Sequence, residues 1–371
     1  MQLIAWSIPG FIVLMAIEAA IARRRGRKVY HLSVAINDLC CGITSQLGNI
    51  FTAALGVLAY VGVYSLHLVD LDPSAASTWL LALLGVDLAY YWWHRLSHEV
   101  NLLWAAHVVH HHSEDLNLAV ALRQALFTSL TFIPFSLPLA LLGVPPLTYF
   151  VAKAINTLYQ FWIHTELIGK LGPAERLINT PSHHRVHHAI NPQYLDRNYA
   201  GILIVWDRLF GSFEPEVERP VYGVIKPLRS LNPLWANVHH YLDIARVAAT
   251  TRTWRAWLYT WIAPPGWRPD HTVPPPTPAE LQQRADHRFD RPASPGLAVY
   301  IAVQAALSVP ATMILLIVSE TAPPGAVLAG SVLLAAGTVA WGALFERRAW
   351  AWPLEVSRVI GSVLLLHYYT A

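Results

Sequence analysis

Most histidines of this 371-residue chain gather in one window, at spacings that suit metal binding. Eleven of the 18 lie between His94 and His188, and the other 276 residues hold seven. Residues three or four positions apart share one face of a helix, so two such imidazoles can reach one ion without bending the backbone. Three motifs have this spacing, one HxxxH and two HxxHH: His94 and His98; His107, His110 and His111; His184, His187 and His188.

The number of clustered imidazoles predicts two ions. The three motifs supply eight histidines, whereas one tetrahedral ion takes four ligands at most. We expect His164, four residues after Gln160, to be a ninth ligand. The set contains no cysteine, which disfavours a thiolate zinc site or an iron–sulfur cluster. We expect His112 and His183 to hydrogen-bond to ligating histidines.

Two carboxylates are candidates for supporting roles in this chemistry. Asp87 lies seven residues before His94, on the same face of an otherwise apolar helix. A carboxylate there is costly, so we expect it to accept the free N–H of a ligating histidine; a plain helix–helix hydrogen bond is the alternative. Glu99 directly follows His98 and is a candidate ligand or proton acceptor.

The elements that position these residues are predicted to be membrane helices. Hydrophobic residues make up 54% of the chain and charged residues only 13%, unlike an ordinary soluble domain. The sequence therefore predicts an all-α integral membrane protein with about eight transmembrane helices. The apolar segments cover residues 3–22, 46–67, 78–94, 125–143, 146–164, 297–318, 325–345 and 353–370.

The loops predict an orientation and three parts. Five basic residues follow the first segment, which places that loop in the cytoplasm by the positive-inside rule. We expect an N-terminal transmembrane bundle (1–164), a cytosolic cap that carries the second HxxHH and ends in a Pro-rich linker (165–296), and C-terminal membrane helices (297–371). The formal net charge of +3, with one short basic run, gives no footprint for nucleic acid.

The ordered motifs resemble those of the fatty acid hydroxylase (sterol desaturase) superfamily, over about residues 80–215. Their flanks are most similar to its ether-lipid-cleaving branch. Five segments carry this likeness: Asp87 to Glu99, Tyr159 to Glu166, Asn179 to His188, Tyr194 to Tyr199, and Trp206 to Glu214.

The resemblance implies a membrane-bound non-haem di-iron oxygenase that uses O₂ on a lipid. It implies that the eight motif histidines hold two iron ions and that Glu99 is a functional acid. The implied reaction is hydroxylation beside the ether oxygen of an alkylglycerol, with tetrahydrobiopterin as reductant. Other branches hydroxylate or desaturate sterols, fatty acyl chains or carotenoids with electrons from a redox protein. Without a fused cytochrome b5 motif, a ferredoxin or cytochrome-type reductase would come from outside.

Two other classes of protein stay open at this point. A membrane dimetal hydrolase could use the same imidazoles, because they suit zinc as well as iron. A metal transporter fits less well, since transport sites lie near the bilayer midplane and these histidines lie at inner helix ends. The composition looks bacterial, and a bacterial host would place the protein in the inner membrane with the metal site facing the cytoplasm.

Overall fold

The chain folds into helices and loops in the computed structural model, which describes residues 2–370. Within that range, β-structure is limited to isolated bridges, so the prediction of an all-α protein is confirmed. The first half of the chain contains α1 (Gln2–Arg24), α2 (Leu32–Tyr64), α3 (Ala76–Glu99), α4 (Asn101–Ala105), α5 (Val108–His111), α6 (Leu118–Leu122), α7 (Thr128–Leu141) and α8 (Pro146–Tyr159). The second half contains η1 (Gly172–Arg176), α9 (Pro181–His187), α10 (Val205–Leu209), α11 (Pro233–Thr250), α12 (Trp254–Ile262), α13 (Pro278–Asp286), α14 (Pro295–Val318), α15 (Pro324–Phe345) and α16 (Ala351–Thr370).

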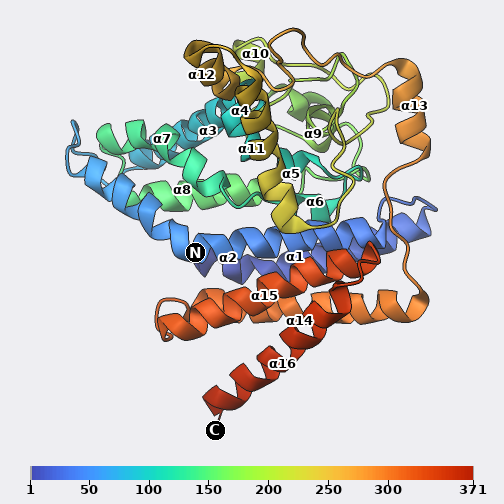
Figure 1. The fold of residues 1–371 in the computed structure, drawn as a ribbon. Helices are drawn as coiled ribbons and strands as arrows, with labels where there is room; N and C mark the ends of the chain where they lie inside the picture. The colour runs from blue at the N-terminus through green and yellow to red at the C-terminus, as the bar shows by residue number, and fades with distance from the viewer. Residues whose placement is uncertain (1, 371) are drawn as a thin grey trace.

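Four helices are long and apolar enough to cross a membrane: α1, α2, α14 and α15. They lie side by side in Figure 1, with α3, α7 and α8 on one flank. The remaining predicted spans also form helices. However, α7 and α8 have 14 residues each, or about 21 Å, which is short for a hydrocarbon layer of about 30 Å. α7 and α8 are consecutive helices joined by a short turn. The loops before α7 and after α8 are therefore predicted on the same side of the membrane, however far the two helices extend into the bilayer.

Helix α2 starts 14 residues earlier than the predicted span at 46–67. Its first half carries buried polar side chains that a hydropathy window excludes. Asp38 pairs with Arg123 at 3.0 Å, and Asn37 donates to the carbonyl of Leu231. The segments that carry Arg123 and Leu231 cover the start of α2. Its polar side chains therefore bond to protein and are not exposed to lipid.

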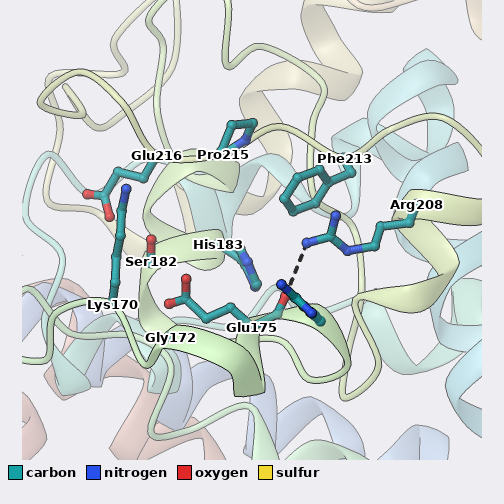
Figure 2. A pocket seen from close by; sticks show the side chains of 10 residues that line it. Lys170, Gly172, Glu175, Ser182, His183, Arg208, Phe213, Pro215 and Glu216 are labelled. Atoms are coloured by element: carbon teal, nitrogen blue, oxygen red, sulfur yellow. Dashed lines mark hydrogen bonds between the residues drawn. The ribbon is translucent and has the colours of Figure 1, made fainter.

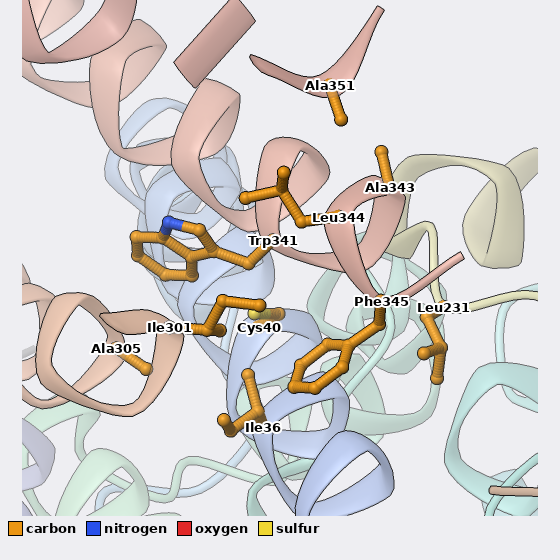
Figure 3. Packing of buried hydrophobic residues seen from close by; sticks show 10 residues of the cluster. All are labelled: Ile36, Cys40, Leu231, Ile301, Ala305, Trp341, Ala343, Leu344, Phe345 and Ala351. Atoms are coloured by element: carbon orange, nitrogen blue, oxygen red, sulfur yellow. The ribbon is translucent and has the colours of Figure 1, made fainter. Parts of the chain in front are cut away.

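The C-terminal helices pack on α2 through a compact apolar cluster (Figure 3). Trp341 and Phe345 of α15 contact Ile36 and Cys40 of α2, and Leu231 reaches the same cluster from the loop before α11. A side chain at Gly342 would collide with the backbone of Leu231. Glycine at this position therefore lets the segment between α10 and α11 lie directly against α15.

The loops predicted to share one side of the membrane are bonded to one another. Arg27, after α1, pairs with Glu166 at 3.1 Å. Arg288 contacts both Asp115, at 3.2 Å, and Glu166, at 3.5 Å. Glu346, between α15 and α16, accepts hydrogen bonds from Ser230 and Leu231. The segment 165–296 thus bonds to the loops after α1, before α6 and after α15.

Candidate metal centre

Nine histidines converge at the C-terminal ends of α3 and α8, beside α5 and α9. They form two groups, and within each group one ligand atom per residue lies within 4.8 Å of the others. All nine side chains are buried. The first group consists of His94, His98, His107, His111 and His187, and the second of His110, His164, His184 and His188.

Helical spacing explains how the motifs divide between the groups. In the first HxxHH, His107 and His111 lie four apart and join one group, while His110 joins the other. In the second HxxHH, His184 and His188 lie four apart and stay together, while His187 crosses over. Each HxxHH motif therefore contributes to both groups, which brings the groups next to each other.

Backbone carbonyls orient four of the nine rings. The Nδ1 atom of each ring lies within hydrogen-bond distance of a carbonyl oxygen, which can only accept. These pairs are His94 with Tyr199 at 2.7 Å, His110 with Arg123 at 2.9 Å, His164 with Gln160 at 2.7 Å and His187 with Arg197 at 3.0 Å. Nδ1 therefore carries the proton in these rings, and Nε2 presents its lone pair to the interior.

The Nε2 atoms approach one another closely. His94 and His107 are 3.1 Å apart, His110 and His164 are 3.2 Å apart, and His164 and His184 are 2.8 Å apart. Two imidazole nitrogens bound to one ion at about 2.0–2.1 Å lie roughly 2.9–3.4 Å apart. For His110 and His164, both protons are on Nδ1, so the two lone pairs face each other in an arrangement that suits binding of one cation by both rings.

Burial keeps these imidazoles in the form that a metal requires. Desolvation lowers the pKa of His187 to about 3 and that of His110 to about 4. Both rings are therefore neutral near pH 7, and neutral imidazole is the ligand form. The donor set contains nitrogen only: in the described part of the chain, neither group includes a carboxylate or a cysteine.

Asp87 does not bond to a histidine among the described residues, so our expectation of a direct contact with a ligating ring is wrong. Its carboxylate accepts four hydrogen bonds, from Asn156 Nδ2, the backbone N–H groups of Ile202 and Leu203, and Trp206 Nε1. Asp87 thus fixes the loop before α10. That loop begins at Tyr199, whose carbonyl accepts the proton of His94, so Asp87 acts on the site through the backbone.

Glu99 lies beside the site, outside both groups. It pairs with Arg95 at 2.9 Å, and its side chain is 42% exposed. The carboxylate that contacts a group histidine is Asp196, whose Oδ1 lies 3.6 Å from His98 Nδ1. Spacing along the chain could not identify Asp196, because it lies 98 residues after His98 in a loop.

Asp207 is a second carboxylate that sequence reasoning missed. It accepts hydrogen bonds from the backbone N–H groups of Tyr199 and Ala200 and from the hydroxyl of Ser212. Burial raises the pKa of Asp207 to about 6. Together with Asp87, it holds both ends of the loop that presents the Tyr199 carbonyl to His94.

The two remaining histidines of the window do not bond to the nine, contrary to our expectation. Both ring nitrogens of His112 are buried without a hydrogen-bond partner, and its ring packs on His239. His183 lines a separate cavity of about 240 Å³ on the other side of α9 (Figure 2). Lys170, Arg208 and Phe213 also line this cavity.

The arrangement of these residues agrees with comparisons to known proteins. Residues 79–212 match the family described as Fatty acid hydroxylase. The cholesterol 25-hydroxylase-like protein of Danio rerio is 34% identical over 223 residues, which cover 56% of this chain and 85% of that protein. The chain belongs to the fatty acid hydroxylase family.

Alkylglycerol monooxygenases are relatives with higher identity. The Homo sapiens protein is 41% identical over 275 residues, covering 70% of this chain and 59% of its own length. The Danio rerio protein is 48% identical over 202 residues, covering 54% and 45%. The chain thus spans about half the length of these relatives. No solved structure matches it.

The segment that matches the fatty acid hydroxylase family contains the whole candidate centre. All nine histidines lie within residues 79–212, as do Asp87, Asp196 and Asp207. The helices α11 to α16 lie outside the match, as do α1 and α2.

Proposed function

We propose that this protein is a membrane-bound di-iron monooxygenase that hydroxylates an alkylglycerol beside its ether oxygen. The observation that carries the proposal is the pair of histidine groups, with Nε2 atoms 2.8–3.2 Å apart, inside the segment of family resemblance. Similarity to alkylglycerol monooxygenases supports this substrate over the sterols, acyl chains and carotenoids that remain alternatives.

The nine histidines would hold the two metal ions, five around one and four around the other. Imidazole suits iron, zinc and copper alike, so iron is inferred from the family. Two bound ferrous ions would supply the electrons and the site for reducing O₂. Backbone carbonyls fix four of the histidine rings, and all nine rings are buried from water. The protein therefore provides a rigid, dry environment for this chemistry.

The reaction balances with one external reductant. One oxygen atom of O₂ enters the C–H bond beside the ether oxygen, and the other leaves as water after taking up two electrons and two protons. The product is a hemiacetal, which collapses to a fatty aldehyde and glycerol. Tetrahydrobiopterin could supply the two electrons, and a ferredoxin or cytochrome-type reductase is the alternative source.

We place the histidine groups on the cytosolic side, in the inner membrane if the host is bacterial. The basic loop after α1 is bonded to Glu166, beside His164, so the two share one side of the membrane. Glu99 remains our candidate proton-transfer residue and Asp87 our candidate positioning residue. The division into residues 1–164, 165–296 and 297–371 remains our proposal for the domains.

A reconstituted assay tests the function. Anaerobically purified protein is loaded with ferrous iron and given O₂, a 1-alkylglycerol and reduced tetrahydrobiopterin, and fatty aldehyde is measured. We expect aldehyde with the natural protein and none with His164→Ala. Aldehyde with ferredoxin but not with the pterin would change the reductant and keep the reaction. Hydroxylation of a sterol or acyl chain, without aldehyde, would contradict the proposed substrate.

A further inference from the structure

Helix α12 exposes a large aromatic and aliphatic surface. Its nine residues include three tryptophans and a tyrosine. Trp254 is 71% exposed, Ile262 is 55% exposed, and Trp257, Leu258 and Tyr259 are each nearly half exposed. Soluble surfaces seldom present such a contiguous patch, so another apolar phase is needed to cover it.

The charges around α12 have one sign. Between Asp243 and Asp270 the chain has no acidic residue, and it has four arginines: Arg246, Arg252, Arg255 and Arg268. Tryptophan and tyrosine are the residues that gather at the boundary between head groups and acyl chains. Arginines beside them attract the phosphates of anionic lipids.

The preceding helix extends this apolar surface and connects it to the membrane helices. α11 packs against α2 and α15, two of the candidate spans. It exposes Leu234, Val238 and Leu242, which are four residues apart and so lie on one face. The exposed face of α11 therefore lies on a helix that packs against two candidate spans, and α12 packs against α11.

A polar clamp fixes α12 to the start of α4, directly after α3. Asn101 donates from its backbone N–H to the carbonyl of Ala263, at 2.9 Å, and from its side chain to the carbonyl of Thr260, at 3.0 Å. Thr260 is fully buried, so this face of α12 is turned to the protein and the aromatic face is turned away. In Figure 1, α12 lies at the edge of the molecule beside α4.

We propose that α12 lies flat in the membrane leaflet nearest the histidine groups, with its aromatic face among the acyl chains and its arginines on anionic lipid phosphates. Asn101 comes three residues after His98 and six before His107, so the clamp would hold the metal centre at a set depth below the head groups. A lipid would then reach the histidines without leaving the leaflet. This docking does not depend on which lipid is oxidised.

Depth-dependent fluorescence quenching tests the docking. The chain has two cysteines, Cys40 and Cys41, and both are buried, so an introduced cysteine can be labelled selectively. Trp257→Cys carries an environment-sensitive fluorophore, and the full-length protein is placed in nanodiscs of phosphatidylcholine with phosphatidylglycerol. The matched control is Val217→Cys, because Val217 is 79% exposed between two glutamates.

We expect the label at 257 to emit at shorter wavelength and to be quenched by lipids that carry a nitroxide near the head group. The label at 217 should show neither effect. Leu258→Cys repeats the measurement if Trp257→Cys does not fold. The docking is overturned if labels at 257 and 258 behave like the label at 217, or if they are shielded from the quencher by a second copy of the chain.

The arginines are tested separately. Arg252→Gln together with Arg255→Gln should weaken quenching at position 257 in nanodiscs that contain phosphatidylglycerol. In pure phosphatidylcholine the substitutions should have little effect. Equal quenching in both lipids, with and without the substitutions, would overturn the role of anionic lipid.

Discussion

His110 Nε2 and His164 Nε2 lie 3.2 Å apart, while each ring gives its Nδ1 proton to a backbone carbonyl. Two neutral imidazoles in this arrangement repel each other unless a cation lies between them. His110 lies in α5 and His164 in the turn after α8, so the contact brings these two parts of the fold together within the four-histidine group.

Removing one member of the four-histidine group should remove one ion. For His164→Ala we expect the metal content to fall from about two to about one equivalent per chain, because three imidazoles remain in that group. Metal analysis of the purified protein measures this. His183→Ala is the control and should keep both ions, since His183 lies outside both groups. Two full equivalents in His164→Ala would contradict our assignment.

Asp87→Asn should destabilise the protein strongly. The carboxylate accepts four hydrogen bonds in a buried position, and an amide turns one acceptor into a donor that faces other donors. We expect a loss of about 3 kcal/mol, seen in thermal unfolding in detergent. Asp72→Asn, at an exposed position, should change stability by no more than about 0.5 kcal/mol.

The same Asp87 variant should also lose activity, because the loop that carries the Tyr199 carbonyl loosens. Loss of an outer partner of this kind typically costs 10–100-fold, on the order of what we expect here. Unchanged stability together with unchanged activity would mean that the four hydrogen bonds contribute little.

Glu99→Gln should leave the metal centre intact. The Glu99–Arg95 pair is partly exposed, so its loss should cost less than about 1 kcal/mol. Because Glu99 lies outside both histidine groups, we expect the metal content to be unchanged. If Glu99 transfers protons, kcat should fall while metal stays bound, and its pH profile should change. Loss of an ion would instead make Glu99 a ligand.

His240 should make stability depend on pH. Burial, and then the nearby His239, lower its pKa from 6.5 to about 4. The unfolded chain therefore binds a proton at higher pH than the folded protein does. Stability from this group is present above pH 6.5 and is lost as the pH falls toward 4.

The variant His240→Gln measures this effect and keeps a donor for the side chain of Asn101. Between about pH 7 and pH 5, we expect the natural protein to lose roughly 1–2 kcal/mol more stability than the variant. The comparison uses metal-loaded protein, so that the buried histidine groups do not titrate. Parallel pH curves would show that His240 titrates near its ordinary pKa.

Local spacing was sufficient to find eight of the nine histidines of the centre, whereas His164 belongs to no motif and was proposed from its place four residues after Gln160. Each motif places two rings on one helical face, and that relation holds wherever the helix lies. The partition into five and four was not predictable, because it depends on the turn through α4 and on the docking of α9. For the same reason, the partners of Asp87 could not be predicted. Asn156 lies on α8, and the other three partners lie 115 or more residues further along, in the loop before α10 and at the start of α10.

Membrane helices were predicted where hydropathy and length agree, as in α14 and α15. The start of α2 was missed, since its polar residues are paired with loops that are distant in the sequence. The aromatic helix α12 falls within the segment 165–296 that was predicted as the cap, although a helix need not span the bilayer to contact it.

The carbonyls that orient His94, His110, His164 and His187 belong to residues 199, 123, 160 and 197. A carbonyl oxygen is present whatever side chain its residue carries. At the more exposed position 197, substitutions can therefore accumulate without turning the ring of His187, provided that the path of the main chain is kept, whereas Arg123 is also held by its buried pair with Asp38. Relatives with quite different residues there could retain the same centre, and damage to it should come from insertions, deletions or prolines that redirect the chain.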